Sequence, residues 1–295
     1  MTLDSAIDVR SKCKCFRVLV IGRANAGKTT LLKKVCRSVE DPEIWSPSGE
    51  KIDASVVEGS DERFQRGIHD IENQLIFKSN PQFVFHDSRG FESGSVDEVD
   101  NVKTFIAERA ASHELSEQLH AIWYCMPTDT NRPSLKADED FFDTDMKGNG
   151  KAFPVIVVFT KYDGLVIEAE SQLVAEGRDE KEAEDEAPNR ARAILASHFR
   201  APLKRAKYPP SEHVVLADMD QESSDCNELI EKTANALTDD ALRLLFVSVQ
   251  QNNIDLCTYF AMKFLAQLSA QKYVSGPCPQ QKENAADPQQ ILVRP

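Results

Sequence analysis

A glycine-containing loop between an apolar run and an amphipathic segment constrains this chain more than any other feature. The loop runs from Gly22 to Thr29 and reads G-R-A-N-A-G-K-T. It follows the apolar run 16–21 and opens into residues 30–35. This order predicts a strand over 16–21 and a helix over 27–38, which is the context in which G-x-x-x-x-G-K-T forms a phosphate-binding loop. The alternative is a chance match in an ordinary strand-to-helix turn.

The residue types of this loop suit a triphosphate. Glycines adopt backbone geometries that a Cβ would hinder, so successive N–H groups can turn inward at the start of a helix. Lys28 adds a positive charge for the β- and γ-phosphates, and the Thr29 hydroxyl is a ligand for Mg²⁺. The expected phosphate-binding residues are Gly22, Ala24, Asn25, Ala26, Gly27, Lys28, Thr29 and Thr30.

The overall charge limits the classes of partner. The chain has 295 residues, a net charge of −13 and a pI near 5.0. These values argue against a nucleic-acid-binding surface, because such a surface needs a basic patch. The short basic clusters at 33–37 and 204–207 are interpreted as solvated faces. We therefore expect no nucleic-acid partner.

The compartment is inferred from the cysteines and from hydrophobicity. The seven cysteines are an odd number and have neither metal-ligand nor disulfide spacing. The first twelve residues carry charges and no apolar core, so no signal peptide is expected. A membrane span within 241–268 is rejected because polar residues at 250–255 and Lys263 interrupt the apolar run. We expect a reducing, cytoplasmic setting.

Strands and helices alternate along the rest of the chain. Apolar runs predict strands at 74–78, 83–87, 121–126, 155–159 and 213–217. Helices are expected over 97–115, 135–146, 165–200 with a break at Pro188, 225–237 and 241–268. The stretch 39–69 shows no apolar periodicity and is expected to be a long loop. This pattern predicts an α/β fold with an open, mainly parallel sheet and helices on both faces, the pair at 71–87 adding one antiparallel edge strand.

The predicted domain organisation has four parts. Residues 1–15 form a flexible N-terminal arm, and 16–238 form the main domain. A C-terminal helical extension covers 239–268, and 269–295 have the composition of a disordered tail. The helix at 241–268 is expected to pack on the domain or to dock a partner.

Four motifs in order resemble the GTP-binding domain of the small G proteins and of their septin-like and immunity-associated relatives. They are G-x-x-x-x-G-K-T at 22–29, D-x-x-G at 87–90, T-K-x-D at 160–163, and Leu216-Ala217-Asp218 in place of the base-contacting loop. Segments 86–92 and 122–125 also resemble uncharacterised fungal G-domain proteins. The resemblance covers about 16–237 and implies a three-layer phosphate-loop NTPase fold that binds GTP or GDP with Mg²⁺.

The resemblance also implies roles for single residues at the phosphate end. Asp87 would hold Mg²⁺ through water, alongside Thr29, and the Gly90 N–H would reach the γ-phosphate. The catalytic candidates are Lys28, Arg89 and His86, with Arg89 neutralising phosphate charge in the same chain. The alternatives are that Arg89 belongs to a solvated loop and that His86 is simply packed.

At the base end the resemblance implies a second set of contacts. Asp163 would accept from the N1 and N2 donors of guanine, which adenine lacks. Lys161 would lie along the base, Thr160 would replace the more common Asn, and the Ala217 N–H would reach the guanine O6. The alternative is a polar turn in which Asp163 only caps a helix.

Two departures from the family pattern bear on hydrolysis. Phe91 takes the place of the Gln that orients water in Ras-type enzymes, so hydrolysis is expected to be slow or to use another group such as His69 or Glu92. Residues 41–70 contain no Thr for the first switch, which leaves Ser55, Ser60 or the segment 66–69.

These observations favour a Mg²⁺-dependent GTP switch with slow hydrolysis. It would be read by an unidentified protein effector, and the helix at 241–268 could mediate homodimerisation. A GTP- or GDP-holding scaffold without turnover is the first alternative. An ATP-using phosphotransferase is the second, and T-K-x-D speaks against it.

Overall fold

The computed structural model describes Cys13 and residues 15–52, 70–88, 96–134, 136–145, 153–249, 258, 259 and 262, without the side chains of 96, 97 and 241. Two compact units divide the chain, Met1–Cys257 and Thr258–Pro295. In the second unit, Thr258, Tyr259 and Met262 are helical. All other described elements belong to the first unit.

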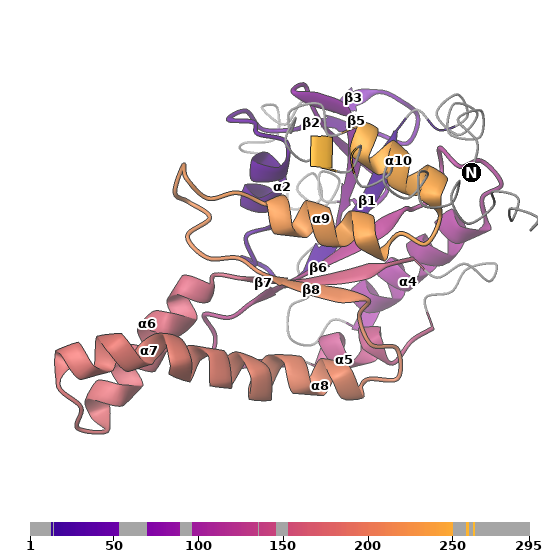
Figure 1. Cartoon of the computed structure of the whole chain (residues 1–295). Coiled ribbons are helices and arrows are strands. Elements are labelled where there is room, and N and C mark those ends of the chain that lie inside the picture. Colours follow the sequence, from indigo (N-terminus) through magenta and orange to yellow (C-terminus); the bar gives the residue numbers. More distant parts are fainter. Residues whose placement is uncertain are drawn as a thin grey trace, which may run out of the picture. The chain divides into compact units, whose positions relative to one another are not determined.

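An eight-stranded mixed sheet forms the centre of the first unit, in the order β3-β2-β4-β5-β1-β6-β7-β8 (Figure 1). The five strands from β5 to β8 in this order are parallel, whereas β4, β2 and β3 pair antiparallel at one edge. The parallel strands are β1 Phe16–Gly22, β5 Asn80–Asp87, β6 Ala121–Pro127, β7 Val155–Thr160 and β8 Glu212–Val215. The antiparallel strands are β2 Glu43–Trp45, β3 Lys51–Ile52 and β4 Gln74–Phe77. The prediction of an α/β fold with a mainly parallel sheet is confirmed.

Helices cover both faces of the sheet, and alternation along the strands decides which residues meet them. Leu19, Ile122 and Val157 share one hydrophobic cluster with helices of one face. These helices are α4 Val96–Ala111, α5 Lys136–Phe142, α6 Tyr162–Ala175, α7 Glu180–Ile194, the π-helical turn η2 Leu195–Arg200, and α8 Ala201–Arg205.

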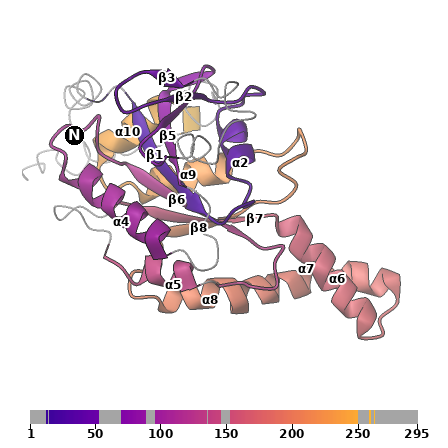
Figure 2. The ribbon, with the colours of Figure 1, turned by 180° about the vertical axis from the view of Figure 1, so that it is seen from behind.

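The opposite face of the sheet is covered by α2 Lys28–Val35, α9 Asn227–Ala236 and α10 Asp240–Ser248 (Figures 1 and 2). The Trp123 indole of β6 donates to the Thr233 hydroxyl of α9 at 3.1 Å. The Phe246 ring of α10 lies 4.6 Å from the Phe16 ring of β1, measured between centroids. The sheet is therefore buried on both sides, which explains why its parallel strands read as continuous apolar runs.

Three local predictions need correction. The stretch 39–69, predicted to be a loop, contains strands β2 and β3. These strands show no apolar periodicity, and they form because β2 pairs with β4 and β3 pairs with β2. The sheet therefore has three antiparallel strands at its edge, where one was expected. Pro188 lies inside α7, and the helical region breaks at Gly177, which has φ 97°. Proline has no N–H to donate to the carbonyl one helical turn earlier. Because Pro188 is exposed, water can donate to that carbonyl instead.

The predicted helix at 241–268 corresponds in part to α10, which ends at Ser248, and residues 250–257 lie outside the described residues. Among the helices that the structure describes, none has the length and apolar character needed to cross a bilayer.

Candidate functional site

The loop between β1 and α2 holds its two glycines for different reasons. A Cβ at Gly22 would lie 2.1 Å from the Cys125 carbonyl oxygen of β6, so this position admits no side chain. A Cβ at Gly27 would meet nothing within 4 Å, but its φ of 75° lies in the left-handed region. Gly27 precedes the first residue of α2 and accepts from the Leu31 N–H at 2.9 Å. The sequence thus folds into a tight turn aimed at a helix N-terminus, as predicted.

The side chains of Lys28 and Asp87 lie close together beside this loop. The Lys28 ammonium donates to the Arg23 carbonyl at 3.3 Å and lies 3.8 Å from Asp87 Oδ1. The two side chains are 10% and 19% exposed. Burial raises the pKa of Asp87 to about 6, against the opposing influence of Lys28. Asp87 Oδ1 is buried without a hydrogen-bond partner among the described residues.

This unpartnered oxygen supplies a test of whether the site fits Mg²⁺. Carboxylate and hydroxyl oxygens are the ligands that Mg²⁺ accepts in proteins. Asp87 ends β5, and the exposed Thr29 lies in the first turn of α2 on the same side of the sheet. A cation here would also relieve the cost of keeping the Asp87 carboxylate ionised. Thr29 and Asp87 therefore fit the metal that was expected of them.

The end of β7 is tied to the phosphate loop by hydroxyl groups. Thr160, which is 4% exposed, donates from Oγ1 to the Ala26 carbonyl at 2.9 Å. Thr128, directly after β6, donates from Oγ1 toward the Thr160 and Lys161 carbonyls at 3.0 and 3.1 Å. The Thr that replaces the more common Asn therefore makes a direct contact with the loop.

The rest of T-K-x-D joins the loop after β8. Lys161 has φ 57° and immediately precedes α6, and its ammonium pairs with Asp129 Oδ2 at 2.9 Å. Asp163 Oδ1 accepts from the Asp218 N–H at 3.0 Å. The carboxylate thus bonds a distant loop, which argues against a role limited to capping α6. Ala217 is half-buried, directly before Asp218.

A cavity of about 300 Å³ lies where these loops converge. This volume is at the lower end of the range for ligand pockets. The lining comes from the start of α2, the β6–α5 and β7–α6 loops and the β8–α9 loop: Gly27, Thr30, Leu31, Asp129, Thr160, Lys161, Asp163, Gly164, Leu216, Met219 and Asp220. Residues predicted from the phosphate loop and from T-K-x-D therefore line one space.

A buried ion pair, which we call the brace, joins the loop between β1 and α2 to α5. Arg23 donates from Nη2 to Asp138 Oδ2 at 2.6 Å, and the two side chains are 9% and 2% exposed. The Tyr124 hydroxyl donates to the other Asp138 oxygen at 2.5 Å. Arg23 also donates to the Arg132 and Pro133 carbonyls at 2.5 and 3.0 Å. The brace ties the phosphate loop to the β6–α5 connection.

Sequence reasoning missed this brace and the residues after β6. Thr128 and Asp129 follow a predicted buried strand, so their place at the carboxyl edge of the sheet could have marked them. Arg23 and Asp138 are 115 positions apart, and nothing in their spacing predicts the pair.

His86 lies away from this site. It is fully buried, donates from Nδ1 to the Ile71 carbonyl at 2.9 Å, and its Nε2 lies 3.1 Å from Arg17 Nη1. Burial lowers its pKa to about 3. Because neighbouring strand residues face opposite sides, His86 meets α4 while Asp87 meets Lys28. We therefore assign His86 to packing and do not carry it forward as a catalytic group.

The other predicted residues divide into placed and unplaced sets. Ala24, Asn25 and Thr30 are exposed along the loop and the start of α2, and Ala26 is buried. Arg89 and Gly90 lie outside the described residues, as do His69, Phe91, Glu92, Ser55, Ser60 and the segment 66–69.

The fold and the site together define an α/β protein with a mixed, mostly parallel sheet and a cavity at the carboxyl ends of its strands. No protein-family model matches the sequence, and no curated protein matches it. Among solved structures, a mutation variant of a protein named SsGBP matches with a TM-score of 0.33 and 11% identity. The match covers 83% of this chain but 59% of that one, so the chain spans little more than half of that protein's length.

Proposed function

We propose that this chain binds GTP and GDP with Mg²⁺ through a phosphate-loop G domain, and that it acts as a switch with slow GTP hydrolysis. The observation that carries the proposal is the cavity that phosphate-loop and T-K-x-D residues line together. A lone phosphate loop would bind many anions. A second recognition element at the same cavity is what a nucleotide requires.

The phosphate end of the site has the groups that this function needs. Lys28 would neutralise the β- and γ-phosphates, with the N–H groups of the loop and of Thr29 and Thr30 as donors. Asp87 and Thr29 would hold Mg²⁺, which neutralises charge on the phosphates when bound. Lys28 already lies between the Arg23 carbonyl and Asp87, so it is oriented toward this point.

The base end supplies the selectivity for guanine. Asp163 bonds the Asp218 amide through Oδ1 alone in the described contacts, and its other oxygen would accept from guanine N1 and N2. Adenine offers no such donors and would leave the carboxylate unpaired. Lys161 would lie along the base, and the Ala217 N–H would meet O6.

Hydrolysis is the less constrained part of the proposal. Phe91 stands where a water-orienting Gln is expected and has no polar group for that task. Lys28 would stabilise the developing phosphate charge, and Arg89 would add to it from the same chain. A nucleotide-holding scaffold without turnover is the second candidate, and Phe91 is the observation that favours it. The protein effector, homodimerisation and the cytoplasmic setting remain predictions.

Nucleotide binding is tested with a fluorescent GDP analogue and Mg²⁺. Lys28→Ala should abolish binding, because the phosphate charge loses its cation. Lys33→Ala is the matched control, since Lys33 is a half-buried lysine of the same helix whose ammonium pairs with Asp41 at 2.8 Å, and its loss should leave affinity unchanged. Asp163→Asn should weaken GTP and admit xanthosine nucleotides. Unchanged GTP affinity in both site variants would refute the assignment.

Turnover separates the two candidates. A single-turnover assay with GTP and Mg²⁺ should show slow phosphate release for a switch. Absence of release over hours, with or without cell extract, would favour the scaffold.

A further inference from the structure

Exposed aliphatic side chains gather on the hairpin of α6 and α7, whose far ends project away from the sheet (Figures 1 and 2). Ile167 is 63% exposed and Val174 is 43% exposed, and both belong to α6. Two helical turns separate them, so they lie on one side of the helix, about 10 Å apart along its axis. Single exposed apolar residues are ordinary, but two at helical spacing form a stripe.

This stripe is separate from the side of α6 that holds the hairpin together. The buried residues of α6 are Leu165, Ala169 and Leu173, and they share a hydrophobic cluster with alanines of α7. At 3.6 residues per turn, they lie on nearly the opposite side of α6 from Ile167 and Val174. A helix with apolar residues on both sides is normally covered on both.

The stripe lines an open groove beside the two helices, with a volume of about 800 Å³. Ile167, Ser171 and Val174 come from α6, and α7 supplies the other wall. The Ser171 hydroxyl donates to the Ile167 carbonyl at 3.0 Å, so its hydrogen is already used within α6. The floor of the groove is therefore mainly apolar. A groove between two packed helices has the shape that receives a third helix.

The rim of the groove is acidic. It carries the carboxylates of Glu170, Glu180 and Glu184 against the single ammonium of Lys181. None of these three carboxylates takes part in an ion pair within the described hairpin, where two arginines pair with carboxylates outside the groove. Glu180 and Glu184 are one turn apart on α7, and Glu170 lies on α6. The negative charge is therefore spread along both walls and not gathered at one point.

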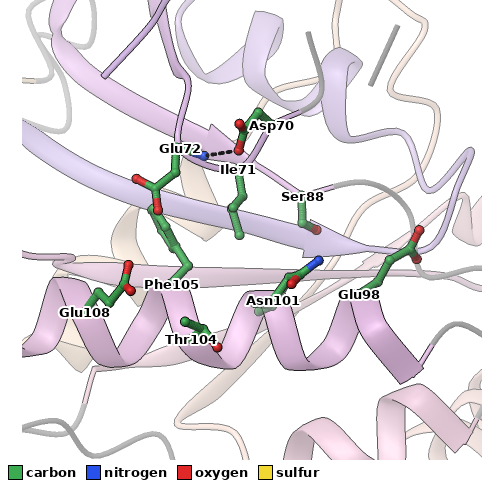
Figure 3. Close-up of a pocket in the computed structure, with 10 residues that line it drawn as sticks. Asp70, Ile71, Glu72, Ser88, Glu98, Asn101, Thr104, Phe105 and Glu108 are labelled. Carbon is green, nitrogen blue, oxygen red and sulfur yellow. Dashed lines mark hydrogen bonds between the residues drawn. The ribbon is translucent and has the colours of Figure 1, made fainter. Parts of the chain in front are cut away.

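A second acidic pocket, between α4 and residues 70–72, has a different kind of apolar lining (Figure 3). Its volume is about 410 Å³. Val102 and Phe105 line it, but each is 2% exposed and belongs to the hydrophobic core. That pocket offers little apolar surface for a partner to cover, whereas the stripe on α6 is open to solvent.

We propose that the groove of α6 and α7 docks an amphipathic helix of a partner protein, with aliphatic residues at helical spacing and lysine or arginine beside them. The aliphatic residues cover Ile167 and Val174, and successive basic side chains meet the carboxylates along the two walls. Two copies joined through this groove would bring their acidic rims together, and the same charge repels anionic lipids and nucleic acids. The proposal does not depend on nucleotide binding.

Fluorescence anisotropy with the full chain, without nucleotide, tests the groove. The probe is a labelled peptide amide of two Lys-Leu-Ala-Lys-Leu-Ala-Lys repeats, which places leucine on one face of a helix. One control peptide has Glu in place of every Lys. The other has the same composition, with leucine spread around the helix. Only the first peptide should bind.

The apolar part of the groove is tested by one substitution. Ile167→Ser should weaken the basic peptide by about fivefold, because an aliphatic side chain covered in the complex is lost. Val39→Ser is the matched control, since Val39 is 94% exposed and lies outside the groove. It should change the affinity by less than about twofold.

The acidic rim is tested by a pair of neutralisations. Glu180→Gln/Glu184→Gln should weaken the basic peptide by about threefold, and the loss should shrink as salt is added. Glu50→Gln/Glu114→Gln changes the net charge equally at exposed positions outside the groove. This control should change the affinity by less than about twofold.

Binding of the basic amphipathic peptide that both groove variants weaken more than their controls supports the proposal. The proposal is overturned if this peptide does not bind, if either control peptide binds equally, or if the groove variants weaken it no more than their controls. Sedimentation velocity should show a monomer. A dimer that Ile167→Ser dissociates would assign the groove to a second copy and overturn the partner. Circular dichroism melts confirm that each variant is folded.

Discussion

Two adjacent residues at the end of β5 show how strand geometry divides tasks between the faces of the sheet. His86 faces α4, where both ring nitrogens have partners, and Asp87 faces α2, where one oxygen has none. A satisfied buried histidine stabilises the fold. An unsatisfied buried carboxylate beside Lys28 instead costs stability unless a cation arrives. His86 therefore contributes to packing, whereas Asp87 keeps an oxygen that would accept a cation under the proposed function.

This cost predicts a pH-dependent effect of Asp87→Asn in the absence of ligand. The pKa of Asp87 in the folded state, about 6, lies above its ordinary value of 3.8, so the folded state gains a proton first as the pH falls. The penalty is therefore fully present above pH 6 and disappears toward pH 4. Asp87→Asn should raise the unfolding free energy at pH 7.5 by about 1–3 kcal/mol, and the gain should vanish near pH 4.

Urea unfolding at both pH values measures this effect. Asp185→Asn, at an exposed position of α7, is the control for the loss of a carboxylate and should be neutral at both pH values. Under the proposed function, Mg²⁺ and GDP should stabilise the wild type, and the Asp87→Asn variant should lose that stabilisation. A variant that is less stable than the wild type at pH 7.5 would show that the carboxylate is already compensated.

At the scale of elements, the site depends on hydroxyl bridges between strand ends and loops. Thr160 joins β7 to the Ala26 carbonyl, and Thr128 joins β6 to the backbone after β7. Both hydroxyls are buried, so removal of either hydroxyl would take a hydrogen-bond donor from the carbonyl that it contacts. The bridges hold the phosphate loop in register with T-K-x-D.

Thr160→Val tests this coupling, since it keeps the shape of the side chain and removes the hydroxyl. It should cost about 1–3 kcal/mol of unfolding free energy and weaken the fluorescent GDP analogue. Thr160→Ser retains the donor and serves as the matched control, with most of the affinity preserved. Equal loss of GDP affinity in the two variants would assign the effect to the methyl group and not to the bridge.

The elements differ in how well the sequence predicts them, for physical reasons. Strands β6 and β7 are buried on both faces and read as continuous apolar runs, so their positions were predictable. The phosphate loop was predictable because its glycines and Lys28 have fixed spacing. Strands β2 and β3 were not, because short edge strands depend on pairing and carry little periodicity.

Within the site, local order was predictable and long-range pairing was not. The lining by Thr160, Lys161 and Asp163 follows from their place directly after β7. The Lys161–Asp129 pair joins loops after two neighbouring strands, and choosing Asp129 requires the register between them. The predicted helix break at Pro188 was wrong for a related reason. A helix tolerates an internal proline when the proline faces solvent, and which side of α7 faces solvent depends on the tertiary packing.

At the scale of the whole first unit, α10 completes the cover of one face of the sheet. Leu245, Phe246, Val247 and Val249 are buried, and the Phe246 ring lies 5.8 Å from that of Phe83 and 4.6 Å from that of Phe16. The helix at 241–268 was expected either to pack on the domain or to dock a partner, and over the part that α10 covers it packs on the domain.

Phe246→Ala should therefore destabilise the first unit, although it lies far along the chain from the site. Loss of a buried aromatic side chain costs about 3–5 kcal/mol of unfolding free energy. Val39→Ala is the control, because Val39 is 94% exposed and its truncation should have little effect. Thermal melts of both variants provide the measurement, and a Phe246→Ala melt that overlays the wild type would mean that α10 contributes no packing energy.

The Arg23–Asp138 brace has a consequence for loop exchange. The G-x-x-x-x-G-K-T pattern allows any residue at position 23. In this protein, however, a loop that kept the pattern but replaced Arg23 would leave the buried Asp138 carboxylate without its cation. The same brace fixes the curvature of the turn before any ligand is present. Under the proposed function, a phosphate chain would then meet a turn that is already shaped, and little conformational entropy would be lost on binding.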